Sequence, residues 1–357
     1  MDDVLWWSLN LATLGFSQLV RPLLNRLGLR ELLGLDPQGW EKQGLPSNVA
    51  ARLVDTLKRL DMRRQVRVAE RIGAVLVGFD NPLFPAALRD IGHPPLALAV
   101  RGRAEWLAET RWIGIVGARQ ASEYGREVAW HFGHRLAAAG VGIVSGLARG
   151  IDARAHQGAL DAGGRTVAFL GCGLDVNYPA ELEALRHAMA CRGALVTQYP
   201  FESRPMGHNF PYRNRLISGL SNGIVVVEGQ MTSGSLHTVD WALQQGREVY
   251  AVPGSIFNKN STLPHHLLTM GAPPITAPED LVGSAPVPGR TVPTPPLTAA
   301  EQHVLQQIGQ APTCADSLEL GALPASQVLS ALVSLEMRGL VRRSPSNRYY
   351  RAGPSLN

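Results

Sequence analysis

A short glycine-rich stretch supplies the first groups in this sequence that could do chemistry. Ser145, Gly146, Arg149 and Gly150 lie between a strand predicted over 141–144 and a helix that begins near Asp152. A strand, a glycine loop and a helix N-terminus leave backbone N–H groups without helical partners at the positive end of the helix dipole. The stretch therefore suits a phosphate or another oxyanion. It is equally compatible with a plain strand-to-helix turn, in which glycine serves only the sharp reversal.

A second stretch combines aromatic and basic side chains. Phe210 is followed by Arg213, Asn214 and Arg215, ahead of a helix predicted over 216–220. An aromatic face can stack on an unpaired base while guanidinium groups hold the neighbouring phosphates, which is how single strands are bound. The alternative is structural, with Phe210 in the core and the arginines paired with carboxylates. We favour the binding interpretation because similar loops follow other strands.

These loops need a scaffold that brings them to one edge. Six apolar runs alternate with helical patterns, and the runs lie at 112–116, 141–144, 166–170, 194–198, 223–228 and 247–252. Such alternation predicts right-handed crossovers and a Rossmann-like α/β fold, with a mostly parallel sheet and helices on both faces. The loops at 117–119, 145–150, 171–175 and 228–235 then lie along the carboxyl edge, where ligands bind in such sheets.

Composition narrows the class of protein. The chain has 357 residues and a formal charge of +5, carried almost entirely by arginine, because lysine occurs only at Lys42, Lys58 and Lys259. A basic balance permits a polyanionic partner. No apolar run is long enough to span a membrane and the N-terminus does not resemble a signal peptide, so we expect a cytoplasmic protein without a membrane partner. The three cysteines are far apart in no ligand spacing, which predicts reduced thiols and no metal site.

Several familiar catalytic patterns are missing from the sequence. No strand is followed by the dinucleotide-binding glycine fingerprint, and no Walker lysine motif is present. Neither His156 nor His237 has an evident carboxylate and nucleophile partner, so both are interpreted as packed or capping residues. We therefore predict no cofactor, no catalytic residue and no enzymatic activity.

The chain divides into four predicted parts. Residues 1–75 form a helical N-terminal domain of the sterile-alpha-motif or helix-hairpin-helix type, and residues 76–282 form the Rossmann-like domain. Residues 283–296 are a proline-rich linker. Residues 297–357 are predicted to be a winged helix, with helices from Thr298 to Ile308, over 315–320 and from Pro324, then a hairpin at 340–351. Its third helix carries only Arg338 as a basic residue, which makes it a poor reader of the major groove.

The ordered motifs resemble the DNA-processing protein A (DprA, or Smf) family. The resemblance covers about 81–272, and its motifs are Ile-Val-Gly-Ala-Arg at 115–119, Ser-Gly-Leu-Ala-Arg-Gly-Ile-Asp at 145–152, Phe-Pro with Arg-Asn-Arg at 210–215, Ser-Gly-Ser at 233–235 and Val-Pro-Gly-Ser at 252–255. It implies a protein that binds and protects incoming single-stranded DNA without sequence preference. It also implies loading of the RecA recombinase in natural transformation and recombination, and a homodimer built through the Rossmann-like domain. Duplex DNA remains an open additional partner.

Carried over to this sequence, the resemblance implies a set of DNA-binding residues. They are Gly117, Arg119, Ser145, Gly146, Leu147, Ala148, Arg149, Gly150, Phe210, Arg213, Asn214, Arg215, Ser233, Gly234 and Ser235. Two departures stand out: Thr197-Gln198-Tyr199-Pro200 replaces a usual Ser-Glu-Tyr-Pro run, and Thr262-Leu263 stands where an Arg-Gly pair is usual.

Two other functions compete on the same scaffold. One is a nucleotide phosphoribohydrolase of the cytokinin-releasing type, which uses a glutamate in a Pro-Gly-Gly-x-Gly-Thr-x-x-Glu loop. Here Trp241, or Thr238 in a shifted match, occupies the place of that glutamate, so the hydrolysis lacks its acid. The other is a module that senses a small nucleotide at the same edge.

Overall fold

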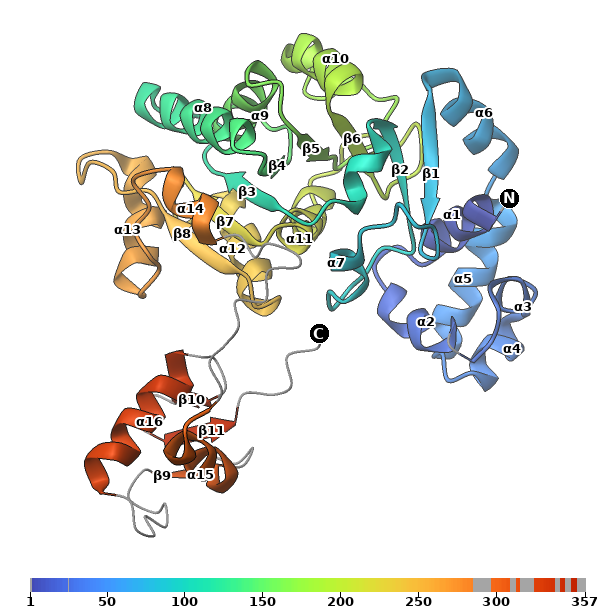
Figure 1. Cartoon of the computed structure of the whole chain (residues 1–357). Coiled ribbons are helices and arrows are strands. Elements are labelled where there is room, and N and C mark those ends of the chain that lie inside the picture. Colours follow the sequence, from blue (N-terminus) through green and yellow to red (C-terminus); the bar gives the residue numbers. More distant parts are fainter. Residues whose placement is uncertain are drawn as a thin grey trace. The chain divides into compact units, whose positions relative to one another are not determined.

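The computed structural model describes residues 2–24, 26–284, 297–308, 313–314, 324–337, 341–343 and 348–351 (Figure 1). The chain forms two compact units, Met1–Pro288 and Gly289–Asn357. No helix in the described part of the chain has both the length and the apolar character needed to cross a membrane.

The N-terminal region is helical, as predicted. Its helices are α1 (Asp2–Ala12), α2 (Ser17–Leu24), α3 (Leu29–Leu33), α4 (Pro37–Lys42), α5 (Ser47–Arg59) and α6 (Met62–Ile72). Trp7, Trp40 and Leu53 are fully buried among them. Asn10 of α1 ties these helices to the sheet, because its Nδ2 donates to the Gln198 carbonyl (2.9 Å) and its Oδ1 accepts from the Leu96 N–H. The helices and the adjoining sheet edge share one apolar core.

One eight-stranded sheet forms the centre of the first unit. Its strands are β1 (Ala74–Gly78), β2 (Ala97–Gly102), β3 (Trp112–Val116), β4 (Gly142–Ser145), β5 (Thr166–Phe169), β6 (Ala194–Thr197), β7 (Gly223–Val226) and β8 (Glu248–Ala251). They are ordered β1-β2-β6-β5-β4-β3-β7-β8. The six strands from β6 to β8 in this order are parallel, whereas β2 pairs antiparallel with both β1 and β6. The Rossmann-like prediction is confirmed.

Helices and short 3-10 turns cover both faces of this sheet. They are α7 (Ala86–Arg89), η1 (Ala104–Ala108), α8 (Glu123–Ala138), α9 (Ile151–Asp161), η2 (Ala180–Leu182), α10 (Glu183–Arg192), α11 (Asn209–Leu220), α12 (Gly234–Gln244), η3 (Lys259–Ser261), α13 (Thr262–Thr269) and α14 (Glu279–Ser284). Alternate side chains of β3 enter different cores: Ile113 and Ile115 pack with α8 and α9, and Trp112 and Val116 pack with α11 and α12. This two-sided burial is why the strands are almost uniformly apolar.

The sequence placed the start of one helix too late. A helix was predicted over 216–220, but α11 begins at Asn209, so the Phe210–Arg215 stretch is helical. Pro211 lies in the first turn of α11, where a missing N–H costs nothing. The helical period therefore distributes the arginines of this stretch around α11.

The second unit contains the predicted wing. Its described elements are α15 (Ala299–Gln307), β9 (Thr313–Cys314), α16 (Ala325–Met337), β10 (Val341–Arg343) and β11 (Arg348–Arg351). Strands β10 and β11 form the predicted hairpin, and β9 pairs with β11. The predicted capping box is present, since Thr298 and Glu301 each accept the other's backbone N–H. The helix predicted over 315–320, Arg338 and most of the linker lie outside the described residues.

Candidate nucleic-acid interface

A groove opens along the carboxyl edge of the sheet. It has a volume of about 580 Å³. Strand β3 lies between β4 and β7, where the strand order reverses, and in open α/β sheets this switch point is the usual place for a ligand. The groove is lined by the loop after β3, the loop after β4, the first turns of α11, and the segment leading into α12.

A small recess adjoins this groove. Arg119, Arg149, Phe210 and Arg213 line both cavities, and the recess continues past them to Leu147, Leu170, Cys172, Tyr178 and Pro179. The groove has a mixed polar and apolar lining, and the recess beside it is lined by apolar side chains together with the three arginines. An elongated ligand with both charged and flat apolar parts fits this combination.

Two glycines let the loops that form the groove approach each other closely. A Cβ at Gly150 would lie 2.2 Å from the Ala118 carbonyl oxygen, and Gly150 also has a φ of +76°. A Cβ at Gly117 would lie 2.6 Å from the Glu228 carbonyl oxygen. Only glycine fits at these positions, because any side chain would separate the loops after β3, β4 and β7.

The glycine loop does not offer its amides to a ligand as the sequence suggested. Asp152 lies in the first turn of α9. Its carboxylate accepts hydrogen bonds from the backbone N–H groups of Gly146 (3.0 Å) and Ala148 (3.4 Å). Asp152 is only 7% exposed, so the protein's own anion occupies this cradle. Burial raises the pKa of Asp152, while the Arg213 guanidinium and the two amides oppose that shift. The prediction that these amides bind phosphate is therefore wrong for Gly146 and Ala148.

The same carboxylate holds a strained turn. Leu147, between the two bound amides, has a φ of +51°, which side-chain-bearing residues rarely adopt. Its side chain is buried and lines the recess. Because Asp152 binds the amide on each side of it, the loop keeps this conformation and presents Arg149 outward. An acidic residue in the first helical turn after a glycine loop was the sequence signal for this role.

Arg119 and Arg149 are the exposed cations of the groove. Arg119 forms no ion pair within the described residues, and its guanidinium carbon lies 5.7 Å from the centre of the Phe210 ring. Arg149 pairs with Glu181 across 3.0 Å, and both side chains are at least half solvated. An exposed pair of this kind contributes about 1 kcal/mol or less, so a phosphate can compete for Arg149.

Arg213 is a buried residue that also reaches the groove. It is 4% exposed and donates to the carbonyls of Gly146 and Phe169 and to Asn214 Oδ1. Burial lowers its pKa, and nearby Asp152 opposes that shift. Through the two carbonyls, Arg213 links α11 to the loop after β4 and to the end of β5.

Arg215 does not line the groove. It is 1% exposed, and its guanidinium donates to the carbonyls of His93 and Tyr212 and to Gln198 Oε1. Its guanidinium carbon also lies 3.8 Å above the Tyr212 ring. The prediction that Arg215 contacts DNA is wrong, because two residues along a helix separate side chains by about 200°.

Phe210 lies in the wall shared by the groove and the recess. Its ring is half-buried, and one side packs on Tyr178 with the ring centres 5.5 Å apart. The guanidinium groups of Arg119 and Arg213 lie within 6 Å of the ring centre. Tyr178 was not among the predicted site residues, since it lies in a loop far from Phe210 in sequence.

The Ser233–Ser235 segment lies at the N-terminus of α12 and borders the groove. The hydroxyls of Ser233 and Ser235 lie 2.5 Å apart, and the Gly234 carbonyl accepts from Asn214 Nδ2 at 3.1 Å. Ser235 is buried, whereas Gly234 is exposed. Asn214 therefore positions this segment.

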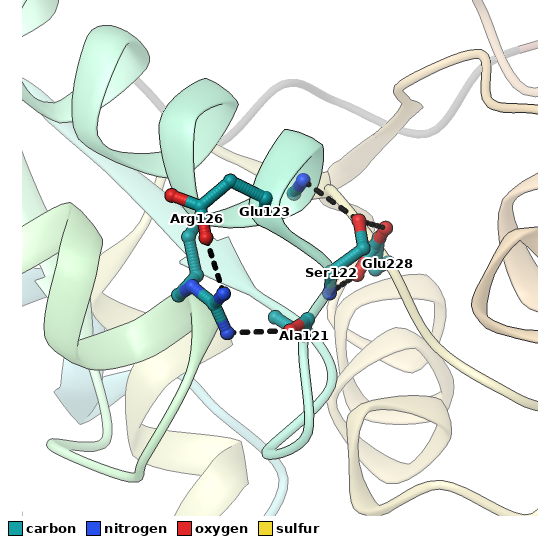
Figure 2. A network of polar contacts seen from close by, with 6 residues as sticks. Ala121, Ser122, Glu123, Arg126 and Glu228 are labelled. Carbon is teal, nitrogen blue, oxygen red and sulfur yellow. Dashed lines mark hydrogen bonds and ion pairs between the residues drawn. The ribbon is translucent and has the colours of Figure 1, made fainter.

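A buried carboxylate joins the loops at the groove's edge (Figure 2). Glu228, 1% exposed, accepts from the backbone N–H of Ser122 (2.8 Å), the Ser122 hydroxyl and Asn258 Nδ2 (2.9 Å). The Ser122 hydroxyl in turn accepts from the Gly125 N–H in the first turn of α8. The network joins α8 to the segments that follow β7 and β8. Sequence reasoning missed it, because Ser122 lies more than a hundred residues before Glu228.

The residues considered for catalysis have structural contacts. His156 is fully buried with Nδ1 2.7 Å from Thr166 Oγ1, and burial lowers its pKa to about 3. Trp241 donates from Nε1 to the Pro211 carbonyl at 3.2 Å. His237 is exposed and lines the groove. Where the hydrolase loop would supply a glutamate, this chain therefore has the indole of Trp241, which is bound to α11, or in the shifted match the buried Thr238.

Of the fifteen predicted residues, twelve line the groove or the recess. They are Gly117, Arg119, Gly146, Leu147, Ala148, Arg149, Phe210, Arg213, Asn214, Ser233, Gly234 and Ser235. Ser145, Gly150 and Arg215 do not. Ser145 is buried and donates to the Ile115 carbonyl.

Two family models match this chain, and the boundary between them lies close to the boundary between the two units. The family model described as DNA recombination-mediator protein A matches residues 75–286, and the DprA winged helix domain matches residues 288–347. Protein Smf of Escherichia coli is 37% identical over 283 residues, covering 76% of this chain and 75% of that protein. The DNA processing protein DprA of Bacillus subtilis is 42% identical over 214 residues, covering 60% of this chain and 72% of that protein.

Solved structures show the same fold. DNA processing protein A from Streptococcus pneumoniae superposes with a TM-score of 0.69 at 28% identity, covering 80% of this chain and 99% of that chain. DNA processing protein A from Helicobacter pylori, described in its single-stranded DNA binding mode, gives a TM-score of 0.54 at 24% identity, covering 59% of this chain and 94% of that chain.

Proposed function

Because the chain belongs to the DNA recombination-mediator protein A family, we propose that it binds single-stranded DNA along the groove at the carboxyl edge of its sheet. One observation carries the proposal. Two exposed arginines, Arg119 and Arg149, line the same groove and recess as the half-buried ring of Phe210. Guanidinium groups suit phosphates, and an aromatic face suits an unpaired base. The Helicobacter pylori relative, described by its single-stranded DNA binding mode, supports the same ligand.

The predicted DNA-binding residues take two roles in this proposal. Gly117, Arg119, Ala148, Arg149, Phe210, Ser233 and Gly234 are proposed to contact the strand. Ser145, Gly146, Leu147, Gly150, Arg213, Asn214, Arg215 and Ser235 are proposed to position them, since these residues are buried or bound to backbone groups. The contacts are with backbone and ring faces, so we expect no sequence preference.

The cellular role that we propose is protection of incoming single strands and loading of the RecA recombinase. The protein would act in the cytoplasm as a homodimer built through the Rossmann-like domain, without enzymatic turnover or cofactor. The four-part division at 1–75, 76–282, 283–296 and 297–357 belongs to the same proposal. Adding the protein to RecA and single strands coated with single-strand-binding protein should accelerate filament formation, and no acceleration would contradict the loading role.

One titration tests the binding proposal. Fluorescence anisotropy with single-stranded DNA, duplex DNA and a nucleoside monophosphate at two salt concentrations should show the tightest binding for the single strand. Its affinity should fall as salt rises, since each phosphate contact releases counterions. Turnover of the monophosphate, abolished by a substitution in the groove, would overturn the proposal and favour a hydrolase. Binding of the monophosphate alone would favour a nucleotide sensor.

A further inference from the structure

Two large apolar side chains stand exposed in the loop that leads to Asn260, a residue of the groove. Ile256 is 81% exposed and Phe257 is 92% exposed, and they are neighbours in the loop between β8 and α13. Figure 1 shows this connection standing out from the body of the unit. Exposed apolar neighbours of this size are typical of interaction sites, because burial of their apolar surface is favourable.

The base of this loop is fixed to the groove. Asn260 lines the groove; its Nδ2 donates to the Gln120 carbonyl at 2.7 Å, and its Oδ1 accepts from Gln230 Nε2 at 3.1 Å. Gln120 and Gln230 also line the groove, and Gln120 directly follows Arg119. Asn258, which directly follows Phe257, donates to the buried Glu228. Phe257 thus directly precedes an anchored residue, three positions before Asn260 of the groove.

The charges around Ile256 and Phe257 favour binding of an anionic strand. Lys259 is exposed and forms no ion pair within the described residues. Glu228, the carboxylate that anchors the loop, is 1% exposed and bound to three donors, so it presents no charge to solvent. Exposed aromatic surface next to a cation is the combination that binds bases and backbone of single strands.

We propose that Ile256 and Phe257 form a second base-stacking contact, which holds an unpaired nucleobase where the strand passes the α12 side of the groove. This inference rests on the proposed function and adds a subsite to it. Phe210 takes one base at the recess, and Phe257 takes another at the opposite border. Neither contact reads base identity, because every base has a stacking face.

The test compares Phe257→Ala with a matched control, Leu243→Ala. Leu243 is 63% exposed near the end of α12 remote from the groove, so its loss removes a comparable exposed apolar side chain. Affinity for oligo-dT should fall about five- to tenfold in Phe257→Ala, at the lower end for an exposed stacking contact. It should be unchanged in Leu243→Ala. Phe257→Trp should retain the affinity.

A second ligand separates stacking from other roles. An abasic oligonucleotide of the same length keeps the phosphates but lacks bases, so wild type and Phe257→Ala should bind it equally. Equal loss on both ligands, or no loss on oligo-dT, overturns the subsite. If light scattering shows that Phe257→Ala changes the oligomeric state without changing DNA affinity, the loop is a contact between copies and the subsite is wrong. Failure of wild type to bind oligo-dT at all refutes the proposed function instead.

Discussion

Two pairs of arginines, all within the motifs of the candidate site, have opposite environments. Arg119 follows β3 and Arg149 follows β4, and both are exposed. Within the described residues their one ion pair is the solvated contact of Arg149 with Glu181. Arg213 and Arg215 lie on α11 and are 4% and 1% exposed, with donors bound to backbone and side-chain oxygens. The exposed pair can exchange partners for a phosphate at little cost. The buried pair would leave several oxygens unsatisfied.

The comparison shows that an arginine in a binding motif can position other residues instead of contacting the ligand. Arg213 holds the carbonyl of Gly146, and Asp152 holds the amide of the same residue. The loop that carries Arg149 is therefore fixed from both sides before any ligand arrives. Prior fixation lowers the entropic cost of binding, which is a reason to retain buried charges beneath the groove.

Arg215→Ala should give the largest effect, and it should fall on stability. The substitution leaves Gln198 Oε1 and the carbonyls of His93 and Tyr212 without this donor, which we expect to cost on the order of 3–5 kcal/mol. Urea denaturation measures this loss. Arg149→Ala is the control and should stay within about 0.5 kcal/mol of wild type. A stable Arg215→Ala that loses DNA affinity would restore Arg215 as a contact residue.

His156 is another buried basic residue, and its burial makes the stability of the protein depend on pH. Its pKa falls to about 3 in the folded protein, whereas the unfolded chain titrates near 6.5. The unfolded state therefore binds a proton first as pH falls. The stabilisation is fully present above pH 6.5 and should diminish toward pH 3, by about 1.4 kcal/mol per pH unit. His156→Gln should flatten this part of the stability profile. An unchanged slope in the variant would assign the loss to other groups.

The sequence predicted the sheet better than the contacts of individual side chains. Strands such as 112–116 are apolar because both faces are buried, and this periodic signal is local. The capping box of Thr298 and Glu301 is local as well. The burial of Arg215 depends on His93 and Gln198, which lie on other elements, and the Glu228 network joins segments distant in the chain. Contacts of this kind follow only from the assembled fold.

Asp152 shows how a local motif can mislead. The strand, glycine loop and helix N-terminus were predicted correctly, as was the helix beginning near Asp152. The usual interpretation leaves the loop amides free for phosphate. In this chain a carboxylate one residue inside the helix binds two of them, so the site depends on side-chain cations instead.

Phe210→Ala tests whether the ring that contacts one arginine of each pair, Arg119 and Arg213, serves binding or packing. If one base stacks on Phe210, affinity for oligo-dT should fall by about 1–3 kcal/mol. Because the ring also packs on Tyr178, part of the change should appear as a lower melting temperature. Anisotropy well below the melting temperature measures binding of folded protein only. Full affinity there would make Phe210 a packing residue and move the base contact elsewhere.

Arg119→Ala should give the smallest of these effects and the most specific one. The side chain is exposed and forms no ion pair within the described residues, so the melting temperature should not change. Affinity should fall by about 1 kcal/mol, and the slope of log affinity against log salt should decrease by about 0.7, as expected for one phosphate contact on a single strand. Arg67→Ala is the matched control, since Arg67 is also exposed but lies on α6, outside the groove. If both variants lose the same affinity, the DNA is attracted by the whole basic surface, and Arg119 and Arg149 do not form a specific phosphate site. If only Arg119→Ala loses affinity and flattens the slope, the groove holds the backbone at a defined point, and the division between contacting and positioning arginines stands.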